Sequence, residues 1–149
     1  LIVNFIFSLT KPEFVQNLYQ KLDLSSLYEL NQWVFFGIYS FILAIAILKA
    51  HLFYMVILLV SKLDLLKPFN SEVAKRITNI SYYTFSIGLI SYIARETTRN
   101  LQHHGFEFDA LNRFWADSQA YILMAAVIYV IATIFSRGVE IQNENDLTV

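Results

Sequence analysis

Hydrophobic residues concentrate in three long stretches of the chain, at residues 32–60, 77–94 and 118–136, with polar and charged segments between them. The hydrocarbon core of a bilayer is about 30 Å thick, and an α-helix that rises ~1.5 Å per residue needs about 20 apolar residues to cross it. Residues 32–60 exceed this length, although Lys49 and His51 interrupt the run. The pattern therefore predicts an all-α integral membrane helix bundle with three complete transmembrane helices.

Two further segments precede these stretches. Residues 1–9 are apolar but cover less than half of a bilayer core, and no positively charged region precedes them, as a signal peptide would require. We interpret them as the remnant of an N-terminal fourth transmembrane helix; a short interfacial anchor is the alternative. Residues 11–22 alternate apolar and polar positions at helical spacing, which predicts an amphipathic surface helix.

Small residues predict which side of each transmembrane helix faces the bundle, because helices in lipid associate through close approach at small side chains. In the first helix this stripe places His51 inward and leaves Lys49, about 200° away around the helix, facing elsewhere. The hydroxyls in the stripe of the second helix can donate hydrogen bonds to the backbone of that helix. The three stripes are Gly37, Ser40, Ala44 and His51; Ser81, Thr84, Gly88 and Ser91; and Ser118, Ala125, Ala132 and Ser136.

Capping residues predict several helix ends. Ser26 with Glu29 three residues later predicts a helix that begins near Leu27 and enters the bilayer at Trp33. Pro68 ends the first transmembrane helix, and Asn70 caps the second, with Glu72 in its first turn. Asp117 is placed to cap the third transmembrane helix and Gly138 to end it, which leaves residues 137–149 as a cytoplasmic tail.

Composition and charge narrow the function classes. Charged residues make up 15% of the chain, against roughly 25% in soluble domains, and the net charge is −1. We therefore expect the lipid bilayer as surroundings and no direct nucleic-acid binding. The sequence contains no cysteine, which excludes disulfides and thiolate metal sites. The Lys and Arg residues outside the predicted spans divide equally between the two sides of the membrane. The compact basic cluster at residues 62–76 nevertheless favours the cytoplasm as the location of that loop and of the tail.

Two sequence signatures carry a family resemblance. One is KPFN at residues 67–70 followed by Arg76, and the other is RGVEIQNENDLTV at residues 137–149. Together they resemble the signatures of the domain-of-unknown-function 2975 (DUF2975) family of small bacterial membrane proteins, over roughly Lys62 to the end of the chain. The resemblance implies four transmembrane helices in the bacterial cytoplasmic (inner) membrane, with both signatures cytoplasmic and one N-terminal helix missing here.

The same resemblance implies a partner, because members of the family are often encoded beside a small helix-turn-helix DNA-binding protein. It carries no catalytic residues across. We therefore expect a non-enzymatic interaction or regulatory protein, or a small subunit of a membrane assembly or homo-oligomer, without a cofactor. The candidate partner-contact residues are Lys67, Pro68, Phe69, Asn70, Arg76, Arg137, Glu140, Glu144 and Asp146.

Ionisable residues offer three other hypotheses. Lys49 and His51 at bilayer depth suggest a small-solute, ion or proton transporter or channel, with a snorkelling lysine and a packing histidine as the alternatives. Arg95 and Arg99, four residues apart, are candidates for binding lipid phosphate, or are ordinary interface anchors. A weak metal-site candidate, against a solvated polar loop, consists of His103, His104, Glu107 and Asp109.

Overall fold

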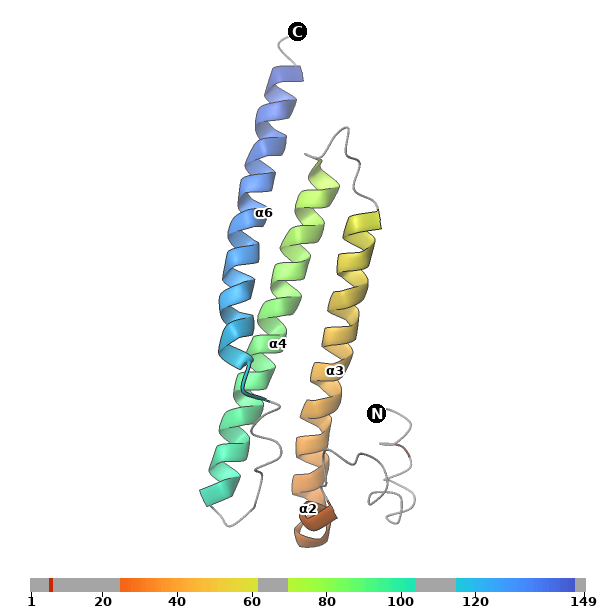
Figure 1. The fold of residues 1–149 in the computed structure, drawn as a ribbon, viewed down its shortest axis with the longest axis vertical. Helices are drawn as coiled ribbons and strands as arrows, with labels where there is room; N and C mark the ends of the chain where they lie inside the picture. The colour runs from red at the N-terminus through yellow and green to blue at the C-terminus, as the bar shows by residue number, and fades with distance from the viewer. Residues whose placement is uncertain (1–5, 7–24, 62–69, 104–114, 147–149) are drawn as a thin grey trace. The chain divides into compact units, whose positions relative to one another are not determined.

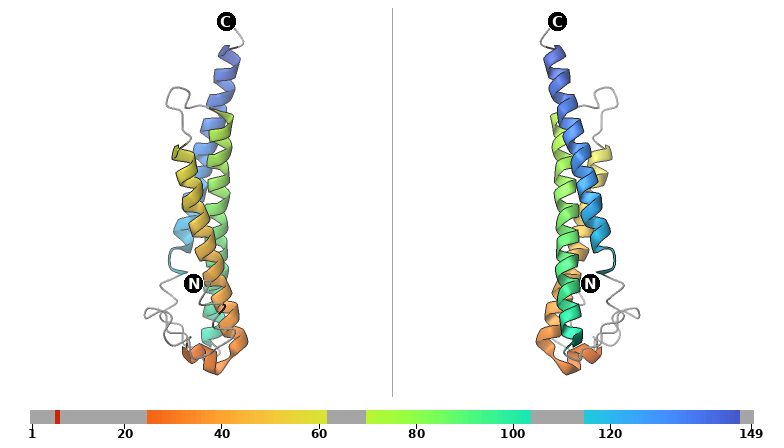
Figure 2. Two further views of the ribbon diagram at one scale, coloured as in Figure 1. Left: turned by 90° about the vertical axis from the view of Figure 1, so that its right-hand side faces the viewer. Right: turned by 90° about the vertical axis from the view of Figure 1, so that its left-hand side faces the viewer.

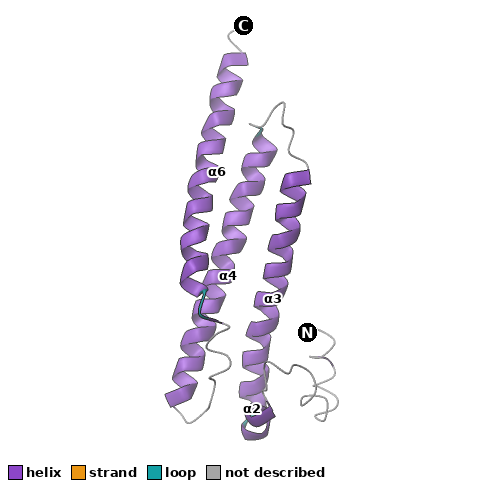
Figure 3. Cartoon of the chain, in the orientation of Figure 1, coloured by secondary structure: helices purple, strands orange, loops and turns teal. Residues whose placement is uncertain are grey.

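The described part of the chain is helical throughout and contains no strand. The computed structural model describes residues 6, 25–61, 70–103 and 115–146, and its helices are α2 (Ser25–Leu30), α3 (Gln32–Ser61), α4 (Ser71–His103) and α6 (Ser118–Asp146) (Figures 1 and 3). The prediction of an all-α fold is confirmed. Apart from Ile6, the predicted helix remnant at residues 1–9 and the amphipathic helix at residues 11–22 lie outside the described residues.

Asparagine side chains begin two of these helices. The Asn70 Oδ1 accepts hydrogen bonds from the backbone N–H of Glu72 at 2.7 Å and of Val73 at 3.1 Å, so the predicted cap of α4 is confirmed. A helix does begin near Leu27, as predicted, but it is the separate six-residue helix α2, which ends at Leu30. Asn31 then caps α3 by accepting from the N–H of Trp33 at 2.9 Å, and the bounds of α3 agree with the predicted stretch at residues 32–60.

The predicted end of the last helix at Gly138 is also wrong, because α6 continues to Asp146. A glycine inside a helix costs only about 1 kcal/mol relative to alanine. It ends a helix reliably only where the chain turns into the left-handed conformation, which the residues after Gly138 do not require. The first part of the predicted tail, up to Asp146, is therefore an extension of α6.

The described residues divide into two compact units, to which α3 and α4 each contribute one half. The first unit comprises Leu1–Ile47 and Ile90–Ser118, and its buried side chains include Phe35, Ile38 and Trp115. The second comprises Leu48–Leu89 and Gln119–Val149. In its core, Val73 and Ile77 of α4 cluster with Ala132 of α6, and the half-buried side chains around them are Leu59, Ile128 and Phe135.

The buried face of α3 differs from the predicted one. The buried residues are Phe35, Ile38, Ile42 and Ile45, whereas Gly37 and Ser40 are exposed, and a Cβ built on Gly37 would meet nothing within 4 Å. The prediction that the small-residue stripe of this helix faces the bundle is therefore wrong. Large aliphatic and aromatic side chains fill the contact in place of a close approach of backbones.

The buried faces of α4 and α6 agree with the predicted stripes. Ser81, Thr84, Gly88 and Ser91 are all buried, and the Thr84 hydroxyl donates to the Ile80 carbonyl at 2.7 Å. On α6, Ser118, Ala125 and Ala132 are buried and Ser136 is half-buried. In the second unit α4 and α6 lie side by side along these faces (Figures 1 and 2).

Two helical segments are long and apolar enough to cross a membrane, Gln32–Ser61 and Ser118–Glu144. Only 11% and 17% of their most apolar windows are buried inside the protein. The core helix of a soluble protein would be mostly buried, whereas these two helices leave most of their apolar side chains half-buried or exposed. The helix α4 is of similar length but too polar on average to be grouped with them.

Candidate functional site

The end of α6 projects beyond the helix on which α6 packs. Because Ala132 lies against Val73 and Ile77 and the two helices run in opposite directions, α6 passes the first residue of α4, Ser71, soon after Phe135. Residues 138–146 then continue beyond the described part of α4 as about 13 Å of helix at ~1.5 Å per residue (Figure 1). We call residues 137–146 the α6 extension.

Charged side chains line the α6 extension. Arg137 Nη1 donates to Glu140 Oε2 at 2.7 Å, and both side chains remain more than half exposed. An exposed ion pair of this kind contributes only about 0.3–0.5 kcal/mol to a helix, so it supports the helix without fixing it. Glu144 is exposed as well. The predicted partner-contact residues Arg137, Glu140 and Glu144 therefore lie together on one short helical segment, which Asp146 ends.

An apolar stripe runs along the exposed side of α6 and continues into the extension. Val127, Ile134 and Ile141 are seven residues apart and are 53%, 62% and 59% exposed. Met124 and Ile131 interleave with them at spacings of three and four and are also exposed. We call these five residues the α6 outer stripe. The sequence analysis predicts a helix end at Gly138 and therefore misses this stripe, although the seven-residue spacing of its apolar residues is visible in the sequence.

The loop signature is divided between described and undescribed residues. Asn70 caps α4, and Arg76 donates to Glu72 Oε1 through both Nε at 3.1 Å and Nη2 at 2.5 Å. Arg76 is thus held in an ion pair on its own helix, with only 24% of its side chain exposed. Residues 67–69, which hold the predicted contacts Lys67, Pro68 and Phe69, lie outside the described residues.

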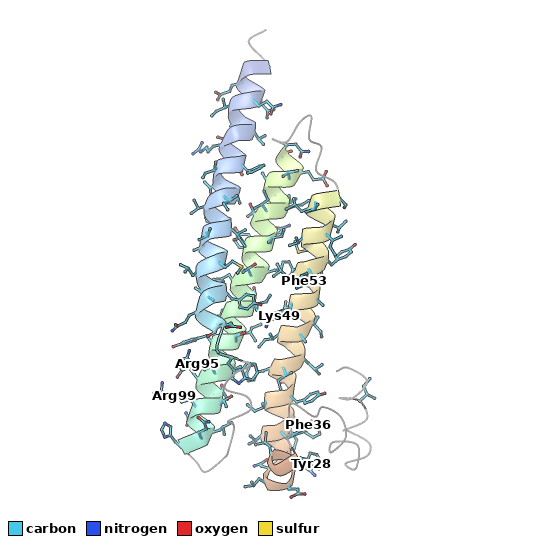
Figure 4. The ribbon with its side chains drawn as sticks, viewed as in Figure 1. Tyr28, Phe36, Lys49, Phe53, Arg95 and Arg99 are labelled. Carbon is cyan, nitrogen blue, oxygen red and sulfur yellow. The ribbon has the colours of Figure 1, made fainter. Side chains whose placement is uncertain are left out.

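Lys49 and His51 contact different helices of the second unit. Lys49 follows Ile45 by four residues on the buried face of α3, and its Nζ lies 5.1 Å from the ring centre of Tyr121 of α6 (Figure 4). His51 is exposed, with its ring 4.7 Å from that of Tyr83 of α4. The predicted orientations of these two side chains are therefore reversed. No contact within the described residues joins them into one pathway.

Aromatic rings lie beside both of these side chains. A lysine ammonium over a tyrosine ring gains about 0.5–2 kcal/mol, depending on how far it is desolvated. The contact with Tyr121 therefore helps α3 to carry a cation among apolar residues. Sequence reasoning did not foresee Tyr121, because no spacing rule links residues so far apart in the chain.

The arginine pair and the metal candidate lie near the end of α4. Arg95 is half-buried and Arg99 is exposed, four residues apart (Figure 4). His103 is exposed in the last turn, whereas residues 104–114, which hold the predicted ligands His104, Glu107 and Asp109, lie outside the described residues. Among the described residues, no group of three metal-binding side chains comes together. The metal hypothesis thus stays a prediction.

A family model described as "Protein of unknown function (DUF2975)" matches residues 17–149 of the chain. The match begins well before Lys62, from which the resemblance was seen in the sequence, and it includes helices α2, α3, α4 and α6. No curated protein and no solved structure matches the chain.

Proposed function

This chain belongs to the DUF2975 family, and from that membership and its exposed apolar helices we propose a multi-pass membrane protein with three complete transmembrane helices. The helices α3 and α6 supply two of them by length and composition. The central part of α4 supplies the third. We place the protein in the bacterial inner membrane, with the extension of α6 in the cytoplasm, as the basic cluster at residues 62–76 favours.

The distribution of side chains on α4 supports its role as a span. No charged residue occurs between Ile77 and Ala94. Ser81, Thr84 and Ser91 of this segment are buried, whereas its exposed positions are all aromatic or aliphatic, namely Tyr82, Phe85, Leu89, Tyr92 and Ile93. A helix that buries serine and threonine side chains and exposes aromatic and aliphatic ones suits lipid as its surroundings. The average polarity of α4 therefore does not count against its role as a transmembrane helix.

We propose that the protein acts without catalysis, as an interaction or regulatory protein that binds a partner protein through the α6 extension. The observation that carries this proposal is Ile141, which is 59% exposed although its neighbours are Glu140 and Gln142. Lipid accounts for the exposed Val127 and Ile134, but the charges of the extension keep Ile141 outside the hydrocarbon. An apolar residue at heptad spacing on a projecting helix is the usual anchor for a partner helix.

The partner fits one of two descriptions. The family resemblance points to a small helix-turn-helix regulator in the cytoplasm, and a second subunit of a membrane assembly, including another copy of the chain, offers a helix of the same kind. In either case the contact centres on Ile141, which favours a partner that presents an apolar groove.

Co-purification in mild detergent from native membranes tests this proposal. We expect a defined partner to stay with the wild-type chain and with Asn143→Ala, a control on another side of the extension, and to be lost from Ile141→Asp. A charge placed in an apolar contact of this kind costs several kcal/mol. If the intact chain retains no protein, or if Ile141→Asp retains the same one, the proposal is wrong.

A further inference from the structure

The C-terminal end of α4 carries an unneutralised cationic face. Arg95 and Arg99 lie one turn apart, followed by His103 after another turn, and Figure 4 shows both arginines extending from the same side of the helix. Side chains four residues apart on a helix are neighbours, so the two guanidinium groups can approach one ligand together.

Within the described residues, no carboxylate pairs with these arginines. The ion pairs there are those of Arg76 with Glu72 and of Arg137 with Glu140. Glu96 lies next to Arg95 in sequence and is half-buried, but it pairs with neither Arg95 nor Arg99. In the part of the chain that the structure describes, Arg76 and Arg137 are thus neutralised by an ion pair, whereas Arg95 and Arg99 are not.

The position of the pair matches the headgroup level of a membrane. Arg95 directly follows the uncharged segment that ends at Ala94, and Tyr92 precedes it by one turn on the exposed surface. In the same unit, α3 begins where α4 ends, and there Trp33 is 86% exposed. Exposed tryptophan and tyrosine are typical of the boundary between hydrocarbon and water, which is also where lipid phosphates lie.

We propose that Arg95 and Arg99 bind the phosphate of an anionic membrane lipid. The planar guanidinium group presents paired N–H donors that match phosphate oxygens, and two such groups one turn apart can hold a single phosphate from both sides. The half-buried Arg95 is the more preorganised of the two, and Arg99 closes the contact from the solvent side. This inference rests on the proposed membrane spans but does not depend on the partner of the α6 extension.

Lipid retention by the purified chain tests the site. The wild type, reconstituted in nanodiscs of phosphatidylcholine with phosphatidylglycerol and then released into detergent, is expected to retain phosphatidylglycerol preferentially in native mass spectrometry. The double variant Arg95→Gln, Arg99→Gln is expected to lose about tenfold or more of this affinity, because both charge-assisted contacts to the phosphate are removed. The double variant Arg95→Lys, Arg99→Lys is expected to recover part of it.

A matched control distinguishes lipid binding at Arg95 and Arg99 from a general effect of positive charge. Lys75→Gln removes one positive charge from an exposed position near the other end of α4 and, compared with Arg99→Gln alone, is expected to leave lipid retention unchanged. Equal loss in this control, or no preference for phosphatidylglycerol in the wild type, would overturn the proposal. Displacement of the lipid by inorganic phosphate alone would also overturn it, in favour of a soluble anion. Failure to enter nanodiscs would contradict the membrane function itself.

Discussion

Hydroxyl side chains in α4 show how a single residue can be polar and still suit an apolar interior. Thr84 and Thr98 are fully buried, and their hydroxyls donate to the carbonyls of Ile80 at 2.7 Å and of Ala94 at 2.8 Å. Each hydroxyl therefore keeps a hydrogen bond within its own helix and leaves no unsatisfied group behind. Polarity at these positions serves packing and does not by itself mark a site.

The cap of α4 leads to a prediction at the residue scale. Asn70→Ala removes the acceptor of two backbone N–H groups that the helix itself cannot satisfy. We expect a loss of about 1 kcal/mol in the free energy of unfolding, measured by denaturant titration in detergent micelles. Asn143→Ala, at an exposed position inside α6, should change it by a few tenths of a kcal/mol at most. Equal effects would contradict the role of Asn70 as a cap.

Residue-level prediction from the sequence succeeded where a side chain differs chemically from its surroundings. Asn70 stands between a proline loop and a helical pattern, so its role was visible. Lys49 and His51 were assigned to the wrong sides of α3 because that helix is apolar all round and offers no polar face to orient it. The predicted orientation of α3 therefore rests on the small residues Gly37 and Ser40. The large side chains of Phe35, Ile38, Ile42 and Ile45 instead form its buried face.

At the scale of elements, α4 and α6 form the pair that the sequence describes best. Both helices place small or hydroxyl residues at spacings of three, four and seven among larger ones, and these residues are the buried ones. Helix ends were predicted less well, since α2 and α3 are separate and α6 continues through Gly138. The projecting extension, and with it the exposed position of Ile141, is therefore missed by the sequence analysis, although the seven-residue spacing points to it.

Close packing at Ala132 gives a prediction for the pair. Ala132 is 1% exposed and lies against Val73 and Ile77. We expect Ala132→Leu to destabilise the protein by about 1–3 kcal/mol, because the extra side chain must displace its neighbours. Ala126→Leu, at an exposed position of the same helix, should be nearly neutral. Thermal unfolding in detergent compares the two, and a neutral Ala132→Leu would show that α4 and α6 do not pack along this face.

At the scale of the whole molecule, the proposed three spans place the two ends of α4 on opposite sides of the membrane. The sequence contains no cysteine, so single cysteines report position without background. With an impermeant maleimide, Lys75→Cys and Asn143→Cys should be labelled from the cytoplasmic side and Asn100→Cys from the other. All three positions are exposed. Labelling of Lys75→Cys and Asn100→Cys from the same side would contradict the span of α4.

The inward-facing hydroxyls of α4 have a consequence for how the protein is made. An isolated helix that enters the bilayer exposes every side to lipid. The side chains of Ser81, Thr84 and Ser91 would therefore face lipid as long as α4 had no neighbouring helix. The translocon would therefore release α4 less readily than α3, which is apolar on all sides. The helix α4 would become stable in the bilayer only after α6 has been synthesised. The last two helices would then insert together at a late stage, and not strictly one by one.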